Sequence, residues 1–358
     1  MVQAETPAPP ARRHRRLRWL WWPGGAFVLL VLGVLIAFNI SPRPGARLIR
    51  YVFEKNAADV KRAMEAHAPG GISSLPDQPY RSGDDDPRLD VYFPETVGPD
   101  ERLPTVVWTH GGAWISGHKD DAAPYFQLIA AQGYAVVSVG YSVAPGATYP
   151  TPIRQVNDAL AYIQQNAARF HVDPERIVLA GDSAGAQITS QIAALVINPA
   201  YAADLGLTPS LAPPQLRGVI LFCGIYDMKV FLANDHLPGN GGLMARVTRW
   251  GTDESMWAYT GSRAHDSAAL RQMSSIDHPT AAFPPAFISG GNDDPLTDGQ
   301  SRPLAATLEG FGVDVTTLFY PPDHEPGLAH EYQFDLDNAD GQNALAQMLS
   351  FLKQHTST

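Results

Sequence analysis

The spacing of hydrophobic and polar positions changes along the chain in a way that predicts alternating strands and helices. Short apolar, β-rich runs occupy residues 89–93, 105–109, 135–139, 177–180, 219–222, 286–289 and 315–320. Between most of them, apolar residues recur at helical spacing in residues 125–132, 153–170, 186–197 and 303–311. Such alternation favours a mostly parallel sheet covered by helices, with ligand sites at the carboxyl ends of the strands. We therefore expect an α/β fold.

The amino-terminal region has a different pattern, because residues 19–40 contain no charged side chain. A helix over this stretch would span about 33 Å, enough for the hydrocarbon core of a bilayer. The five arginines between Arg12 and Arg18 would hold the preceding segment in the cytoplasm. Residues 1–18 are thus expected to be a basic cytoplasmic segment and residues 19–40 a single-pass transmembrane anchor, with the remaining chain outside the cytoplasm.

A cleaved signal peptide is the competing interpretation of the same region. Its apolar part would be residues 26–38, but residues 39–43 offer no clear A-x-A-like cleavage site. The pattern therefore favours an uncleaved anchor in the cell membrane over a secreted protein. Three tryptophans are expected at the lipid headgroup level: Trp19, Trp21 and Trp22.

Residues 41–88 precede the regular alternation and are interpreted as a linker followed by an amino-terminal helix. Residues 41–45 are broken by Pro and Gly, residues 47–67 have an amphipathic pattern, and residues 69–87 are predicted to form a loop. The helix could form part of a cap. A long interruption of the alternation, at about residues 228–277, is expected to be an insertion that lies over the site.

Charge and cysteine content exclude several functions. The formal net charge is −10, with about +4 in residues 1–23 and about −14 in the remainder. An acidic body without a basic stripe argues against nucleic-acid binding, because phosphate contacts need clustered Lys and Arg. Cys223 is the single cysteine, so no intramolecular disulfide can form, and its apolar run predicts a buried structural residue.

Candidate chemistry begins with Gly181-Asp182-Ser183-Ala184-Gly185, which follows one predicted strand and precedes a predicted helix. A G-x-S-x-G sequence at such a turn exposes the serine hydroxyl above the sheet, because small neighbours allow close backbone approach. Ser183 is therefore a candidate nucleophile. The short motif is weak evidence alone and needs supporting context.

That context starts with His110-Gly111-Gly112-Ala113-Trp114, which follows the predicted strand at residues 105–109. Small residues there leave backbone N–H groups free to stabilise the oxyanion of an acyl-transfer intermediate, each worth about 3 kcal/mol. We expect Gly112, Ala113 and Ala184 to donate in this oxyanion hole, with Gly111 shaping the turn. A Gly-Gly turn without chemistry is the alternative.

Two acids and two histidines compete for the remaining roles. Asp293 and Asp294 follow the predicted strand at residues 286–289, and His324 and His330 follow the last one. The order Ser, Asp, His is the one expected for this kind of sheet, but the residues alone do not choose within either pair. A metal site at residues 323–330 is also considered, yet no H-E-x-x-H occurs, so no metal and no cofactor are expected.

Residues 89–353 resemble an α/β-hydrolase, and within that fold the hormone-sensitive-lipase-like esterases. The resemblance rests on H-G-G-A-W at 110–114, Y-S-V-A-P at 141–145, G-D-S-A-G at 181–185 and D-P-L at 294–296. It implies a central, mostly parallel eight-stranded sheet with helices on both faces, and a catalytic domain over residues 89–358. It also implies a triad: Ser183 as nucleophile, Asp294 as acid and His330 as base.

The chain departs from the family pattern at two positions: the first leaves the substrate open, and the second lies in the segment by which the family identifies the base. Ala113 stands where a third glycine is common, and Tyr332 replaces the usual Phe after His330. The resemblance implies a serine carboxylic-ester hydrolase that forms an acyl-enzyme on a small to medium, or lipid-like, acyl ester. The alternatives left open are an amidase, formamidase or acyltransferase on the same fold, and a catalytically silent, membrane-tethered binding protein.

Overall fold

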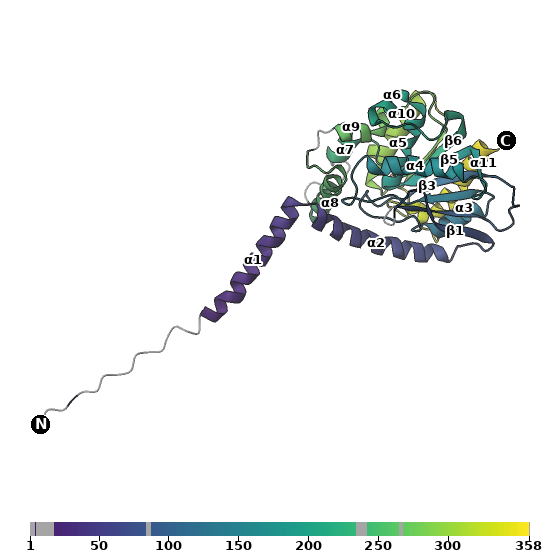
Figure 1. The fold of residues 1–358 in the computed structure, drawn as a ribbon. Helices are drawn as coiled ribbons and strands as arrows, with labels where there is room; N and C mark the ends of the chain where they lie inside the picture. The colour runs from purple at the N-terminus through teal and green to yellow at the C-terminus, as the bar shows by residue number, and fades with distance from the viewer. Residues whose placement is uncertain (1–3, 5–17, 84–86, 234–241, 265–267, 358) are drawn as a thin grey trace. The chain divides into compact units, whose positions relative to one another are not determined.

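The computed structural model describes residue 4 and residues 18–83, 87–233, 242–264 and 268–357 (Figure 1). Contacts divide the chain into two units, Met1–Pro44 and Gly45–Thr358. The expected basic segment lies almost wholly outside the described residues.

The second unit is built on one eight-stranded sheet of strand order β1-β2-β4-β3-β5-β6-β7-β8. The β1–β2 and β2–β4 pairs are antiparallel, and the remaining five pairs are parallel. The expected mostly parallel eight-stranded sheet is thus confirmed. The strands are β1 Ile72–Pro79, β2 Arg88–Pro94, β3 Leu103–Thr109, β4 Ala135–Val139, β5 Val172–Asp182, β6 Leu216–Phe222, β7 Ala286–Gly290 and β8 Val315–Phe319.

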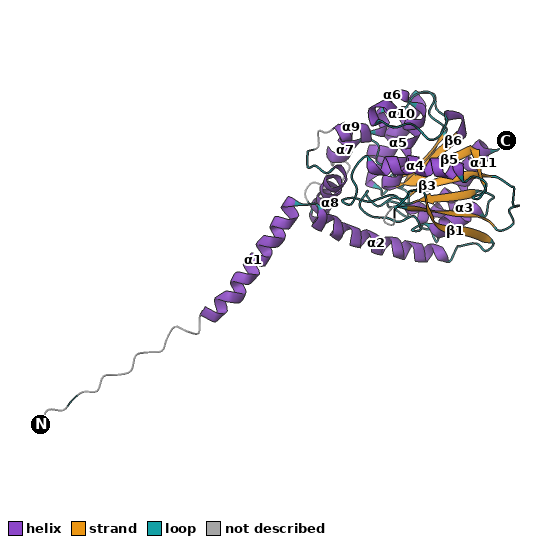
Figure 2. Cartoon of the chain, viewed as in Figure 1, coloured by secondary structure: helices purple, strands orange, loops and turns teal. Residues whose placement is uncertain are grey.

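The sheet is buried on both faces, which explains why its central strands are almost continuously apolar. On β3, Val107 belongs to one hydrophobic cluster, whereas Val106 and Trp108 belong to the other. Figure 2 shows the helices packed around the sheet. The helices of the sheet layers are α3 Ala123–Ala130, α4 Thr151–Gln165, α5 Ser183–Ile197, α6 Pro199–Leu205, α10 Arg302–Gly310 and α11 Ala339–Thr356, with short turns Pro213–Gln215, Ser275–Asp277, Thr297–Ser301 and Tyr332–Phe334.

Strand β1 corrects the prediction of a loop over residues 69–87. Its sequence contains two prolines, and its side chains are half-buried or exposed, so it lacks the signal of a core strand. Pairing with β2 determines its structure, and the register shifts between Leu75 and Gln78, next to Pro76. An edge strand tolerates this proline because its N–H is not needed in the ladder.

Helix α1, Arg18–Ile40, is apolar along the part whose side chains are described, and Phe27 and Leu29 are exposed by 65% and 71%. Among the described residues, no single helix is both long enough and apolar enough to span a membrane. Gly24–Ile40 and Arg43–Glu65 meet both criteria only when they are taken together, as a pair broken by a bend. The three tryptophans expected at the headgroup level lie outside the described side chains.

Helix α2, Arg43–Glu65, confirms the expected amphipathic helix and begins inside the segment predicted as a linker. Its Ala46, Ile49 and Met64 are buried against the α/β body. In its described residues, the predicted insertion at about residues 228–277 contains the helices α7 Met228–Ala233, α8 Leu243–Thr260 and α9 Ala268–Met273.

Candidate active site

Ser183 lies at a sharp turn between β5 and α5, with a left-handed φ of +51°. Glycines on both sides make the turn possible. A Cβ on Gly181 would lie 2.6 Å from the Gly185 backbone, and a Cβ on Gly185 would lie 2.0 Å from the carbonyl oxygen of Thr109. A non-glycine residue in the left-handed region stores strain that its surroundings must offset. The turn therefore holds the hydroxyl group of Ser183 above the carboxyl end of the sheet.

His330 and Asp294 complete a continuous hydrogen-bonded chain with Ser183. The imidazole Nε2 of His330 lies 2.9 Å from Ser183 Oγ, and its Nδ1 lies 3.0 Å from Asp294 Oδ2. These separations are within hydrogen-bond reach for a nucleophile, a base and an orienting acid. The structure thus brings together the three residues that the resemblance implied, while their catalytic roles stay predictions.

The structure also distinguishes between the two candidate acids and between the two candidate histidines. Asp294 has a side chain with no exposed surface, and its Oδ1 accepts a 2.9 Å hydrogen bond from the Leu296 N–H. Its neighbour Asp293 is exposed. His324 lies with Nε2 2.9 Å from Asp340, not beside Ser183.

The electrostatic surroundings of His330 favour its protonated form. Burial opposes protonation of the ring, but the Cys223 sulfur and the Asp294 carboxylate outweigh it and raise the pKa of His330 well above its usual value. Burial raises the pKa of the Cys223 thiol to about 11, so that thiol is neutral near pH 7. Asp294 is therefore the charge that stabilises an imidazolium at this position.

Cys223 is buried, as expected, but it also contacts the site. It follows β6, and its Sγ, a carboxylate oxygen of Asp294 and a ring nitrogen of His330 all lie within 4.8 Å of one another. This thiol is neutral near pH 7, so it adds negative charge beside the imidazole only once it ionises. Cys223 lies near His330 because β6 and the loop that carries His330 pack together in the fold. The apolar sequence around Cys223 therefore could not predict this contact.

The oxyanion loop follows β3 and has three consecutive left-handed residues. Gly112, Ala113 and Trp114 have φ values of +102°, +50° and +59°. A Cβ on Gly112 would lie 2.4 Å from the Ser116 carbonyl oxygen, so only glycine fits there. Among the described residues, the N–H groups of Gly112, Ala113 and Ala184 have no hydrogen-bond acceptor, which leaves them available as donors to a ligand.

Gly111 belongs to the oxyanion loop but is not one of its free donors, in line with the expectation that it shapes the turn. Its N–H donates a 2.8 Å hydrogen bond to Asp182 Oδ2 and cannot also bind an oxyanion. Gly111 is a glycine because a Cβ there would lie 2.3 Å from that same carboxylate oxygen. Its contribution is the tight turn that carries Gly112 and Ala113.

Aromatic contacts hold the oxyanion loop from both ends. Tyr141, from the Y-S-V-A-P stretch, donates a 3.0 Å hydrogen bond to the His110 carbonyl and stacks on its ring at 4.2 Å between centroids. At the other end, Trp114 stacks on Tyr259 of α8 at 5.1 Å and donates to Gln187 Oε1. The loop is thereby fixed to the sheet and to the insertion before a substrate arrives.

A pair of acidic side chains beside the loop was not anticipated. Asp182 is buried and accepts hydrogen bonds from the Trp108 indole at 2.7 Å and from Gly111. Glu331, which has a left-handed φ of +62°, brings its carboxyl to the same turn, since a Cβ on Gly111 would lie 3.0 Å from Glu331 Oε1 and 2.3 Å from Asp182 Oδ2. Burial, and then the charge of Glu331, raise the pKa of Asp182 well above its usual value. Because two ionised carboxylates repel strongly when desolvated, the charge of Glu331 adds to burial in favouring the protonated form of Asp182.

The site opens into a cavity of about 400 Å³. Helix α2 contributes one wall and the insertion contributes another, so both segments expected to cover the site do line it. The residues from α2 are Phe53, Asn56, Ala57, Val60 and Met64, and those from the insertion are Phe231, Thr248 and Thr252. None of the described lining residues is Lys or Arg.

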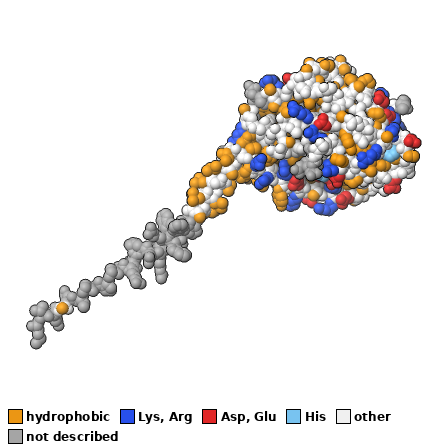
Figure 3. Space-filling model, in the orientation of Figure 1, with side chains coloured by type: hydrophobic (Ala, Val, Ile, Leu, Met, Phe, Trp, Pro, Cys, Tyr) orange, Lys and Arg blue, Asp and Glu red, His pale blue; other side chains and the backbone are white. Residues whose placement is uncertain are grey.

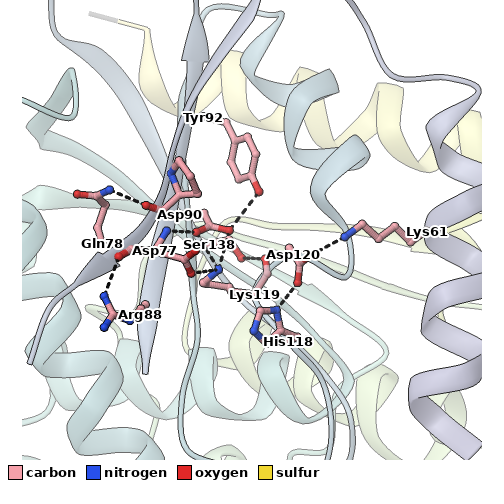
Figure 4. A network of polar contacts seen from close by, with 11 residues as sticks. Lys61, Asp77, Gln78, Arg88, Asp90, Tyr92, His118, Lys119, Asp120 and Ser138 are labelled. Atoms are coloured by element: carbon pink, nitrogen blue, oxygen red, sulfur yellow. Dashed lines mark hydrogen bonds and ion pairs between the residues drawn. The ribbon is translucent and has the colours of Figure 1, made fainter. Parts of the chain in front are cut away.

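Polar contacts fix α2 against the rest of the domain. Arg50 donates hydrogen bonds of 2.7 and 2.8 Å to the carbonyls of Ile115 and Ala144. Nearer the end of the helix, Lys61 forms a 2.6 Å ion pair with Asp120, in the segment that follows the oxyanion loop (Figure 4). These contacts connect α2 to the loop that carries the oxyanion donors.

A second group of charged side chains holds the segment that follows the oxyanion loop against the edge of the sheet. Lys119 is buried between Asp90, at 2.9 Å, and Asp77, at 3.0 Å, and its carbonyl accepts from Ser138 (Figure 4). Burial lowers the pKa of Lys119, but the hydrogen bonds that its ammonium donates to Asp90 and Asp77 outweigh burial and raise that pKa. The lysine therefore remains charged and ties β1, β2 and the oxyanion segment together.

Comparison with known sequences agrees with this geometry. Residues 89–308 match the BD-FAE family. The chain is 29% identical to esterase LipQ of Mycobacterium tuberculosis over 79% of its own length, but it spans only 64% of that relative. It is 31% identical to carboxylesterase NlhH of the same organism over 73% of each chain.

Two solved structures of esterases have a similar fold. An inhibited esterase B from Lactobacillus rhamnosis superposes with a TM-score of 0.71 at 20% identity, covering 86% of this chain and 95% of that one. The Pyrobaculum calidifontis esterase gives 0.67 at 24% identity, covering 92% and 97%. At these identities the likeness shows the α/β-hydrolase fold alone. The family match extends over more than half of the residues, and the chain belongs to the BD-FAE family of α/β-hydrolase esterases.

Proposed function

We propose that the protein is a serine carboxylesterase that acts through an acyl-enzyme. The observation that carries the proposal is the unbroken chain from Ser183 through His330 to Asp294, at the floor of a cavity that free N–H groups also face. Its membership of a family with relatives named esterase and carboxylesterase supports the reaction class.

In the proposed reaction, His330 Nε2 accepts the proton from Ser183 Oγ as that oxygen attacks the ester carbonyl carbon. Negative charge develops on the carbonyl oxygen, where the N–H groups of Gly112, Ala113 and Ala184 stabilise it. The imidazolium then donates its proton to the leaving alcohol. Asp294 keeps the Nδ1–H oriented and stabilises the positive ring throughout. Water, activated by the same histidine, hydrolyses the acyl-enzyme.

The cavity favours a small to medium, uncharged or lipid-like ester. Its volume of about 400 Å³ lies in the lower part of the range usual for small-molecule sites, about 300–1,000 Å³. The walls from α2 and the insertion are largely apolar. With no Lys or Arg among the described lining residues, a carboxylate or phosphate on the substrate would meet no countercharge.

We also propose that residues 19–40 anchor the chain in the cell membrane, with the basic segment inside and the catalytic domain outside. The absence of charge in that stretch and the arginines before it support this orientation. Fractionation of cells followed by sequencing of the mature amino terminus tests it. A soluble species that begins after residue 38 would show a cleaved signal and a secreted enzyme instead.

Turnover of a short acyl p-nitrophenyl ester tests the reaction. Ser183→Ala and His330→Gln are each expected to abolish it, whereas His324→Gln, which alters a histidine paired with Asp340, should retain it. Comparable turnover of the matching amide would assign an amidase, and transfer of the acyl group to an added alcohol an acyltransferase. Substantial activity in pure Ser183→Ala would refute the assignment, and an inactive parent protein would favour a binding protein.

A further inference from the structure

Exposed apolar side chains gather on two helices of the α/β unit. Among the described residues of that unit, the exposed large apolar side chains lie on α2 and α8, with the exception of Phe311. We call the six on the two helices the rim surface: Leu48, Tyr51, Val52, Phe53, Leu243 and Val247, exposed by 40–79%. Contiguous apolar surface of this kind on a folded domain marks an interaction site.

The rim surface borders the mouth of the active-site cavity. Phe53 both lines the cavity and is 40% exposed, and Val247 adjoins the lining residue Thr248. The two helices also touch, since a Cβ on Gly45 of α2 would lie 2.6 Å from the carboxylate of Glu254 on α8. A partner that covers the rim surface would therefore sit over the entrance that leads to Ser183.

The exposed face of α2 is distinct from its buried face, so its apolar residues are not explained by packing. Ala46 and Ile49 face the domain core, and Arg50 fixes the helix through the carbonyls of Ile115 and Ala144. Leu48, Tyr51 and Val52 occupy the opposite side of the same turns. The helix is held firmly by one face while the other faces outward.

Charge around the rim surface indicates what binds there. Residues 45–53 and 243–250 contain four arginines and no Asp or Glu, in a chain whose formal net charge is −10. Arg47, Arg246 and Arg249 are exposed. Figure 3 shows hydrophobic and basic side chains on this side of the domain, with acidic ones among them further along α2. Helices with an apolar face bordered by arginines lie in the interface of anionic lipid, where each basic residue strengthens binding about fivefold.

We propose that the rim surface docks onto an anionic lipid surface and places the cavity mouth against it. The docking stands apart from the chemistry of Ser183. Delivery of a lipid-like ester from the lipid directly into the cavity rests on the proposed esterase function.

Site-specific fluorescence of the full chain tests the docking. The comparison is made between positions of the α/β unit and does not require that α1 inserts into the lipid. Val52→Cys and Val247→Cys are each labelled with a polarity-sensitive NBD probe, and Phe311→Cys is the matched exposed control. Native Cys223 is buried and has a raised pKa, so it should label poorly. Vesicles of phosphatidylglycerol with phosphatidylcholine are compared with phosphatidylcholine alone.

We expect a blue shift and intensity gain at positions 52 and 247 on anionic vesicles, a smaller change on zwitterionic ones, and none at 311. Adding Arg47→Glu to the Val52→Cys chain should reduce the shift. No shift at 52 and 247, or an equal shift at 311, would overturn the proposal. A shift that grows with protein concentration without vesicles would assign the surface to a second copy of the chain and also overturn it.

A kinetic arm separates docking from catalysis. Val52→Ser combined with Val247→Ser should slow hydrolysis of an ester carried in anionic vesicles severalfold and leave hydrolysis of a dissolved short ester within about twofold, while Phe311→Ser should change neither. Equal rates on the vesicle-borne ester, or an equal loss on both esters, would contradict the docking role. If the parent chain hydrolyses neither ester, the esterase proposal fails, and the fluorescence result still decides the docking.

Discussion

Replacement of Asp294 by Asn isolates the electrostatic contribution of the acid at nearly constant shape. The asparagine oxygen can still accept the hydrogen bond from Leu296 N–H, so the local backbone should be retained. What is lost is a fully buried negative charge, 3.0 Å from His330 Nδ1. A pair of unit charges about 4 Å apart is worth about 4 kcal/mol at an effective dielectric constant of about 20.

Solvent reduces this figure, because the side chain of His330 is 35% exposed. We therefore expect a loss of about 2–4 kcal/mol of transition-state stabilisation, or about 30- to 1,000-fold in kcat/KM. The pH dependence should change as well. Since the negative charge raises the pKa of His330, and only the neutral ring can accept the serine proton, wild-type activity rises with pH through that pKa. Without the charge, this acid limb should move to lower pH.

Steady-state hydrolysis of a dissolved short ester between pH 5 and 9 measures both effects. Asp293→Asn provides the matched control, since Asp293 is the exposed neighbour and does not bond to the histidine. Its rate and profile should match those of the parent. The reasoning is refuted if Asp294→Asn keeps its rate within twofold, if its acid limb stays in place, or if Asp293→Asn loses as much.

Three further predictions follow from the backbone and the charges of the site. Gly185→Ala should prevent stable folding, because its Cβ would lie 2.0 Å from Thr109 O; a soluble variant with an unchanged melting temperature would contradict this close approach. Ala113→Gly should relieve strain at φ +50° and broaden acyl-chain preference in an ester series, while an unchanged preference would show that the methyl group does not shape the acyl side. Glu331→Gln should make the melting temperature fall less between pH 5 and 8. Because the pKa of Asp182 is raised in the folded protein, folding loses stability as the pH rises above the pKa that Asp182 has in the unfolded chain. Removing the charge of Glu331 lowers the pKa of Asp182 and so weakens that loss. Equal slopes for variant and parent would exclude an effect of the Glu331 charge on the pKa of Asp182.

Local sequence patterns were sufficient for most of the α/β body. Residues 105–109 and 135–139 read as strands because they are apolar and buried on both faces, and the structure gives β3 and β4 those residues. Strand β1 was missed because a half-buried edge with Pro76 has no periodic signal, and only its ladder with β2 determines it. Helix α2 was found through its amphipathic spacing, although its start lay earlier than the Pro and Gly residues suggested.

Site residues that belong to a short sequence motif could be predicted, whereas contacts between segments far apart in the sequence could not. Ser183 and the oxyanion loop follow from short motifs after strands. The choice of Asp294 needed a family resemblance, because its burial and its contact with His330 depend on tertiary packing. The Asp182–Glu331 contact joins residues far apart in sequence, and nothing local to either one indicates it.

Covalent labelling of the full chain by a fluorophosphonate, followed by peptide mapping, tests the central claim most directly. The probe phosphonylates a serine only if that hydroxyl is activated by its base beside an oxyanion site. A single adduct on Ser183, abolished in His330→Gln and retained in His324→Gln, is the predicted result. An adduct on another residue, or no adduct in a preparation that hydrolyses esters, would contradict the assignment of Ser183 as the nucleophile.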